Sequence, residues 1–210
     1  PDLEQQLVDE LEQDIKNKEL YNNGAPHTGS NSWTWYNEDG CLTTKSEMKN
    51  DKTHGIQWNY HKTGNIFTKI TFINGIKNGR YEQWEKNGNK EMDGYLLNGK
   101  NDGRKRGYRN GKIYFIENYK NGKLNGLAKY NTLDGKRERE GIYKNGKRDG
   151  KWIFYNKDGV KIWEGEYKDD VVEGELIQHR ENGIIKSKET FVNEEMKGTY
   201  EYYHENGKLR

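Results

Sequence analysis

Two columns of glycine recur along this 210-residue chain with a period of 24 residues. One column consists of Gly55, Gly79, Gly103, Gly126, Gly150, Gly174 and Gly198. The other consists of Gly40, Gly64, Gly88, Gly111, Gly135, Gly159, Gly183 and Gly207. Each column contains a single shorter gap of 23 residues, at the fourth unit. A fixed period of this length predicts a repeat protein, in which each unit is one supersecondary element that packs on its neighbours.

Two further columns in the same phase indicate that the unit is a β-hairpin. One is a turn pair: Asn50-Asp51, Asn74-Gly75, Asn98-Gly99, Asn121-Gly122, Asn145-Gly146, Asp169-Asp170 and Asn193-Glu194. The other is apolar or aromatic: Met48, Phe72, Leu96, Tyr119, Tyr143, Tyr167 and Phe191. Asn-Gly pairs favour positive φ and tight turns between strands. In the unit that begins at Gly150, residues 151–155 and 160–167 therefore read as two strands around a turn at 156–159.

Composition excludes a compact globular core and also argues against disorder. Only 30% of the residues are hydrophobic, whereas a globular domain is nearly half apolar. Disordered chains have few aromatic residues and a high net charge, but this chain is 12% aromatic with a formal net charge of +2. Stacked hairpins need to bury only a few rings per unit. We therefore predict an all-β fold, an elongated single-layer antiparallel solenoid of about eight 24-residue hairpins.

Alternation of polarity along the second strand of each unit is weak. The column Thr44, Thr68, Met92, Phe115, Arg139, Trp163 and Ser187 mixes polar and apolar side chains. A sheet with one thinly covered face gives such a pattern. Trp33, Trp35 and Trp58 are interpreted as core residues.

The first 30 residues differ from the repeats. Leu3, Leu7, Leu11 and Ile15 recur every four residues, which predicts an amphipathic helix over residues 1–20 with a net charge of −5. We interpret this helix as a cap on the first hairpin, and alternatively as an interaction helix. Residues 21–30 read as a linker, and residues 31–210 form the repeat domain.

Residues 143–159 carry the pattern Tyr-x-Asn-Gly-Lys-x-x-Gly-x-Trp-x-x-Tyr-x-x-x-Gly. This pattern, which recurs in part over residues 72–88, resembles MORN repeats. The ending at residues 203–209 is similar to the bacterial variant of that repeat, which includes antitoxins of the YwqK type. The resemblance implies a non-enzymatic scaffold that binds protein partners, anionic lipids or a toxin. Unit four departs from the pattern because it lacks the tryptophan, and Asn131 and His179 stand where tyrosine is usual.

No residues show the spacing of a catalytic or metal centre. The histidines have no cysteine partners at metal-ligand spacing, and Cys41 is the one cysteine in the chain. The sequence contains no nucleophile elbow, phosphate-binding loop or zinc-binding His-Glu motif. We therefore expect a protein that is not an enzyme and that uses no cofactor or metal.

Charge is distributed unevenly along the repeats. Residues 98–151 carry a net charge of +10, whereas residues 157–199 carry −4. A basic band flanked by acidic segments would steer an acidic partner, and ordinary solvated β faces are the alternative reading. Nucleic acid is a poorer fit, because the total charge is near neutral and no motif supports it.

An aromatic column follows each repeat glycine by five residues: Tyr36, Tyr60, Trp84, Tyr108, Tyr155, His179 and Tyr203. We favour packing between neighbouring repeats for this column, with partner binding as the alternative. The candidate partner-binding residues are Arg104, Lys105, Arg106, Arg109, Tyr108, Trp84, Tyr60, Tyr155 and His179.

These observations lead to one functional hypothesis and two alternatives. The leading hypothesis is an immunity protein or antitoxin that binds a toxin and occludes it. The alternatives are a membrane-peripheral scaffold that binds anionic lipid through its basic repeats, and a rod that spaces other domains. We expect a cytoplasmic protein, and alternatively one that is anchored to a membrane or exported through a removed N-terminal segment.

Overall fold

The computed structural model describes residues 31–192 and 195–210, which form two compact units. The first unit comprises residues 31–111 and 119–122, and the second comprises the remaining described residues. The predicted helix over residues 1–20 and the linker over 21–30 lie outside the described residues. The described residues contain strands and turns and no helix, so the prediction of an all-β chain is confirmed for them.

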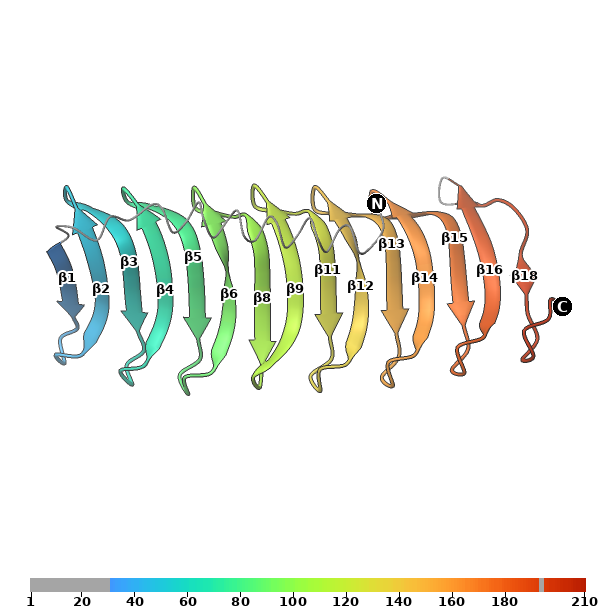
Figure 1. The fold of residues 1–210 in the computed structure, drawn as a ribbon, viewed down its shortest axis with the longest axis horizontal. Coiled ribbons are helices and arrows are strands. Elements are labelled where there is room, and N and C mark those ends of the chain that lie inside the picture. Colours follow the sequence, from blue (N-terminus) through green and yellow to red (C-terminus); the bar gives the residue numbers. More distant parts are fainter. Residues whose placement is uncertain (1–30, 193–194) are drawn as a thin grey trace. The chain divides into compact units, whose positions relative to one another are not determined.

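The first unit is an antiparallel sheet in which the strands follow one another in chain order (Figure 1). Its strands are β1 (Asn31–Tyr36), β2 (Leu42–Lys49), β3 (Lys52–Tyr60), β4 (Ile66–Ile73), β5 (Ile76–Trp84), β6 (Lys90–Leu97), β7 (Lys100–Asn101) and β8 (Gly103–Arg109). Strands β1 to β6 pair successively, and β6 then pairs with both β7 and β8.

The second unit repeats this arrangement. Its strands are β9 (Lys112–Lys120, of which the last two residues belong to the first unit), β10 (Lys123–Leu124), β11 (Gly126–Asn131), β12 (Arg137–Lys144), β13 (Lys147–Tyr155), β14 (Lys161–Lys168), β15 (Val171–His179), β16 (Ile185–Val192), β17 (Glu195–Met196) and β18 (Glu201–Tyr202). Strand β11 pairs with β9 and β12, the strands up to β16 pair successively, and β16 pairs with β17 and β18. The predicted antiparallel hairpins are therefore confirmed within each unit.

The Asn-Gly pairs form the predicted tight turns. Asn74 and Gly75 have φ values of 50° and 84°, in the left-handed region that asparagine and glycine tolerate best. The Gly75 N–H donates a hydrogen bond of 2.7 Å to the carbonyl of Thr53 in the preceding repeat. Each of these turns thus ends one hairpin and also joins it to the hairpin before.

The fourth unit is one residue shorter than the others because the turn between its two strands is shorter. In the second repeat this turn spans five residues, and the His61 N–H donates to the Asn65 carbonyl at 2.8 Å. In the fourth unit Asn110 and Gly111, with φ values of 49° and 74°, form a two-residue turn instead. A shorter turn type therefore accommodates the 23-residue gap.

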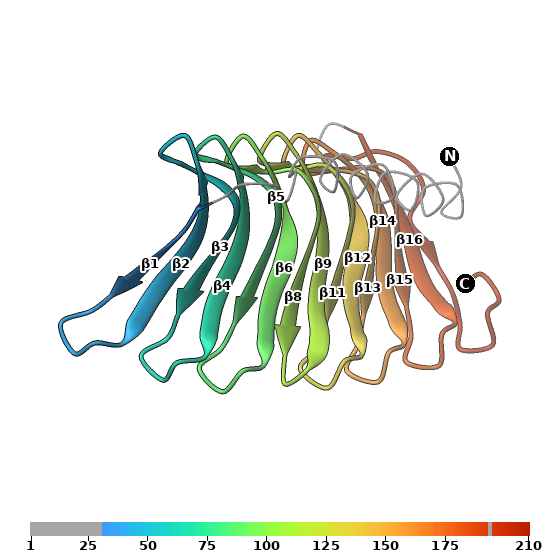
Figure 2. The ribbon, with the colours of Figure 1, turned by 60° about the vertical axis from the view of Figure 1, so that its left-hand side comes forward.

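The strands of both units are curved along their length (Figure 2). Repeat glycines supply this bend, because they lie at bulges in the first strand of each hairpin. Opposite Glu166 of β14, the register shifts and Gly174 has a φ of 97°. A bulge of this kind bends the strand and increases its local twist.

Side chains pack within a single layer where glycines leave room for rings. Trp152, which is 1% exposed, lies in register between Gly141 on β12 and Gly165 on β14. A Cβ on Gly141 would lie 2.3 Å from the Trp152 ring, so only glycine fits there. The indole N–H donates to the Ile142 carbonyl at 3.0 Å, which satisfies the buried polar atom.

The interpretation of Trp33 and Trp35 as core residues is wrong. Their exposed fractions are 49% and 41%. Both lie on β1, which pairs with β2 alone among the described residues of this unit, so each ring has neighbours on one side only. Trp58, on an internal strand, is half-buried and has the Lys45 ammonium 5.6 Å from its ring centroid.

Candidate functional site

The basic cluster that is continuous in sequence is divided between the two faces of the sheet. Arg104, Lys105 and Arg106 are successive residues of β8, and successive side chains of a strand point to opposite faces. The Arg106 guanidinium binds the Asp93 carboxylate at 2.8 Å, whereas the Lys105 ammonium lies 5.8 Å from the centroid of the Tyr119 ring. Arg109 is exposed at the end of the strand. The cluster therefore does not form one patch of positive charge.

Asp93 is the centre of a buried polar group in the first unit. It is 3% exposed, and the Tyr108 hydroxyl donates to it at 2.9 Å while the Lys90 ammonium approaches it at 3.5 Å. Burial, together with the hydrogen bond to Asp93, raises the pKa of Tyr108 to about 12. Tyr108 and Arg106 thus join two repeats through a carboxylate.

The same arrangement recurs twice in the second unit. The Tyr155 hydroxyl donates to Glu140 at 2.7 Å, and the His179 Nε2 atom lies 3.0 Å from a carboxylate oxygen of Glu164. Burial raises the pKa of Tyr155, and its hydrogen bond to Glu140 acts in the same direction. His179 stands at the sequence position where tyrosine is usual, and its ring lies beside Glu164 as the tyrosine hydroxyls lie beside the acids of the other two groups.

Glu164 has the richest set of partners. Lys151 binds it at 2.7 Å and Lys161 at 3.1 Å, in addition to His179. Burial favours the neutral form of Glu164, but these three partners outweigh that effect and lower its pKa to about 2. The charges around Glu164 therefore neutralise one another within the sheet.

Trp84 and Tyr60, the two remaining candidate residues, lie in the first unit, and neither is part of a group like those around Asp93 and Glu164. Trp84 is half-buried, and the Lys90 ammonium lies 5.8 Å from its ring centroid. Its carbonyl oxygen lies 2.9 Å from the Nε2 atom of His61. Tyr60 is also half-buried.

The opposite face of the second unit carries an aromatic row across its strands. The members pair in register from β9 to β15 and are Phe115, Tyr130, Arg139, Phe154, Trp163 and Gln178. The Arg139 guanidinium stacks 4.5 Å from the centroid of the Tyr130 ring. We call this surface the aromatic row.

The equivalent row of the first unit is mostly polar. Its members from β2 to β6 are Thr44, Asn59, Thr68, Gln83 and Met92. The Thr44 hydroxyl donates to Asn59 at 3.1 Å, and Asn59 donates to Thr68 at 2.7 Å. The repeat position is thus used for internal hydrogen bonds in one unit and for aromatic rings in the other.

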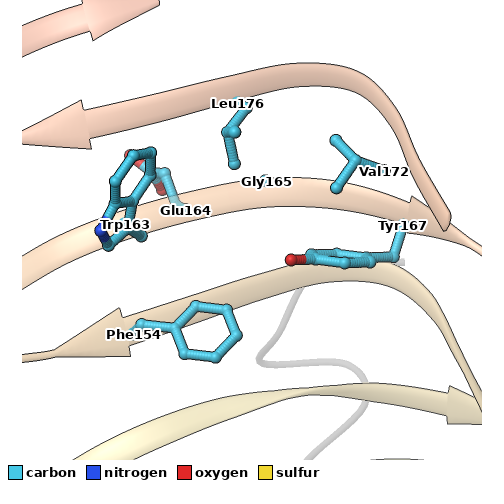
Figure 3. Close-up of a pocket in the computed structure, with 7 residues that line it drawn as sticks. All are labelled: Phe154, Trp163, Glu164, Gly165, Tyr167, Val172 and Leu176. Carbon is cyan, nitrogen blue, oxygen red and sulfur yellow. The ribbon is translucent and has the colours of Figure 1, made fainter. Parts of the chain in front are cut away.

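A hollow of about 280 Å³ opens beside the aromatic row. It is lined by Phe154, Trp163, Glu164, Gly165, Tyr167, Val172 and Leu176. Figure 3 shows the side chains of Phe154, Trp163, Tyr167, Val172 and Leu176 around the place where Gly165 has no side chain of its own. The lining is therefore mainly apolar, on strands that the sheet holds in register.

Two charged residues lie one strand beyond the hollow on either side. Arg139 is the register partner of Phe154, and Glu189 is the register partner of Leu176. Neither makes an ion pair within residues 31–192 and 195–210. By contrast, Arg148, which stacks 4.2 Å from the Tyr167 ring centroid, is held by Asp170 at 3.1 Å.

Sequence reasoning missed this face. It selected the column that contains Tyr155, whereas the lining residue is Phe154, one position earlier on the other side of the strand. Phe115, Arg139 and Trp163 belong to the column that is mixed in polarity. The change in that column from Thr44 and Thr68 to Phe115 and Trp163 was a signal that could have located the face.

In the described part of the chain, no group of three His, Cys, Asp or Glu residues is placed to hold a metal ion. No helix in that part has the length and apolarity to span a membrane.

Comparison with known families gives a match to the model of the MORN repeat variant at residues 105–121 and 196–210. The first segment covers most of β8 and β9, and the second begins at the end of β17. A comparison with curated proteins gives no match. The family match agrees with the hairpin repeats, and it carries no information about a partner.

Proposed function

We propose that this chain is a non-enzymatic repeat scaffold that binds a partner protein through the aromatic face of its second unit. The observation that carries the proposal is the apolar hollow beside the aromatic row, between a cation and a carboxylate that have no ion-pair partners in the described residues. Protein interfaces are enriched in aromatic residues and arginine, and binding energy concentrates in such apolar pockets. The similarity to MORN repeats supports a scaffold.

In its most specific form, the proposal is that the chain is an immunity protein or antitoxin. Such a protein needs no chemistry of its own, because it inhibits by covering the active surface of its target. A rigid sheet presents its side chains with little loss of conformational freedom on binding, which favours tight complexes. The resemblance of residues 203–209 to the bacterial repeat variant motivates this form.

A pull-down from source cells tests the binding function, with the full chain as bait and mass spectrometry as the readout. We expect one dominant protein partner. Co-expression then tests the antitoxin form, because a toxic partner should be tolerated by cells only when this chain is present. Recovery of no partner contradicts the scaffold proposal, and a partner that is harmless when expressed alone contradicts the antitoxin form.

Binding of anionic lipid is the second candidate, and the +10 charge of residues 98–151 favours it. Two observations argue against it. Arg106 is bound to Asp93, and Lys105, the adjacent residue of the strand, points to the opposite face of the sheet. Flotation with phosphatidylserine vesicles at low salt tests this candidate. Binding that disappears when Arg104, Lys105 and Arg106 are changed to Glu would support it, and absence of flotation would remove it.

A further inference from the structure

We infer that the hollow beside Gly165 receives one large apolar side chain from an amphipathic helix of the partner, with an acidic residue of that helix on Arg139 and a basic one on Glu189. This inference rests on the proposed protein-binding function and specifies the site and the chemistry of the partner.

The apolar lining of the hollow and its position on a sheet face favour a side chain presented by another protein. Pockets that enclose whole small molecules begin at about 300 Å³ and surround most of the ligand. The hollow measures about 280 Å³ and lies on the face of a sheet. Rings line it on two adjacent strands, with Phe154 on β13 and Trp163 on β14. A large aliphatic or aromatic side chain, presented together with the turn of helix that carries it, is therefore the occupant that suits its open position and its lining.

Arg139 and Glu189, on either side of the hollow, define how far apart the complementary charges of the partner must be. Arg139 is on β12 and Glu189 is on β16, four strands apart on the same face. At about 4.8 Å between strands, the two charges are roughly 19 Å apart. Complementary charges on the partner must have the same separation, with the apolar side chain between them.

A helix suits a sheet face better than an extended segment does. The backbone groups of β13, β14 and β15 already pair with one another, so the face offers no donors or acceptors to an incoming backbone. An extended segment would leave its own backbone groups unpaired on an apolar surface, whereas a helix satisfies them internally. At 1.5 Å per residue, a separation of roughly 19 Å corresponds to about 13 residues of helix.

The other surfaces are less suited to this role. The opposite face of the second unit uses its acids internally, as Glu164 does with Lys151 and Lys161. The equivalent row of the first unit uses its polar groups internally, as Thr44 and Asn59 do. The aromatic row thus combines an apolar hollow with charges that have no internal ion pair.

A displayed library of 20-residue helical peptides with randomised surface positions is the probe, and the full chain is the target. We expect the selected peptides to share an acidic residue, a large apolar residue and a basic residue on one helix face, with the two charges about 11 or 14 residues apart, which are the same-face spacings nearest to roughly 19 Å. Arg139→Glu should weaken their binding about tenfold or more, and Trp163→Ala should do the same. The double variant Arg139→Glu/Glu189→Arg should restore binding to peptides in which the two charges are exchanged.

Lys144→Glu is the matched control for Arg139→Glu, because Lys144 is an exposed residue of the same strand and the change in charge is equal. It should leave peptide binding unchanged. Circular dichroism of Trp163→Ala shows whether this variant keeps the sheet. If the variant unfolds, the charge variants at Arg139 and Glu189 still test the site. Peptides without the expected pattern, or peptides that bind all variants equally, would overturn the assignment.

The partner recovered by pull-down separates this inference from the proposed function. If Arg139→Glu and Trp163→Ala still bind that partner, the site is wrong and the scaffold function stands. If no partner is recovered but the peptides bind as expected, the site stands and the proposed function fails. Sedimentation of the chain alone provides a further check, since self-association that Trp163→Ala abolishes would identify a second copy as the occupant and overturn the inference.

Discussion

Single residues join successive repeats through carboxylates. Asp93, Glu140 and Glu164 each receive a hydrogen-bonding side chain from the next repeat, which is Tyr108, Tyr155 and His179 respectively. The column that the sequence offered as a candidate binding surface thus contributes contacts between repeats in both units. Glu164 is buried and paired with Lys151 and Lys161, so it stabilises the sheet in its ionised form.

Acidification should therefore weaken the second unit through Glu164. Its pKa in the folded chain is lowered from 4.5 to about 2, so its contribution to the free energy of unfolding is fully present above about pH 4.5. The contribution is lost as the pH falls toward 2, because the unfolded chain then binds the proton first. Urea titrations between pH 2 and pH 6 measure this loss.

Glu164→Gln provides the comparison for that experiment. The variant has no carboxylate at this position, so its free energy of unfolding should change less than that of the unmodified chain over the same pH range. If the two free energies fall in parallel, Glu164 is not the source of the acid sensitivity.

At the level of the element, the hairpin turn is the most regular part of the repeat. Most of the turn pairs end in glycine, whose positive φ costs little. Asp51 and Asp170 hold the same position with φ values of 58° and 77°. At Asp170 the cost of the positive φ is offset, because its carboxylate accepts hydrogen bonds from the backbone N–H and the guanidinium of Arg148. Asp51 is exposed and has no comparable contact among the described residues.

Asp51→Gly should raise the free energy of unfolding. The left-handed conformation costs an L-residue more than the extra chain entropy that glycine loses, and we expect a net gain of about 0.5 kcal/mol. Asp51→Ala is the control and should lower stability, since alanine tolerates positive φ less well than aspartate. Denaturant unfolding measures both, and a Gly variant that is less stable than the unmodified chain would contradict this explanation of the turn.

At the level of the whole molecule, each unit is built from contacts between neighbouring hairpins. In the first unit β3 pairs with β2 and β4, and β5 pairs with β4 and β6. A repeat of this kind can lose one period without losing the pattern by which the remaining strands pair.

Deletion of residues 55–78, which is one period of 24 residues, should leave a folded sheet. The deletion joins His54 to Gly79, so β5 takes the place of β3 beside β2. Deletion of the 12 residues 55–66 is the control, because it joins His54 to the second strand of a hairpin and reverses the required direction. Circular dichroism and urea unfolding should show a cooperative β-sheet for the first variant alone, and loss of structure in both would contradict nearest-neighbour packing.

The repeat, its length and the positions of its turns could all be predicted from sequence because they depend on local backbone chemistry. Positive φ at Asn74 and Gly75 follows from residue type alone, and so does the shortened turn at Asn110 and Gly111. The face that carries the apolar hollow could not be predicted in this way. Phe154 and Tyr155 are adjacent and both aromatic, and a register shift between them precedes the turn. Which of the two lines the hollow depends on pairing with neighbouring strands.

Sequence by itself thus determined that this chain consists of β-hairpins of 24 residues, since the period and the turn residues encode that locally. Only the tertiary structure decided which side chains meet across strands. It showed that Arg106 binds Asp93 and that His179 lies beside Glu164. These side chains, which were candidates for partner binding on sequence grounds, contact acids within the sheet. The tertiary structure also gathered Trp163, Phe154 and Leu176 around Gly165 from three strands. The physical reason is that a face is defined by register, and register is a property of the paired strands together.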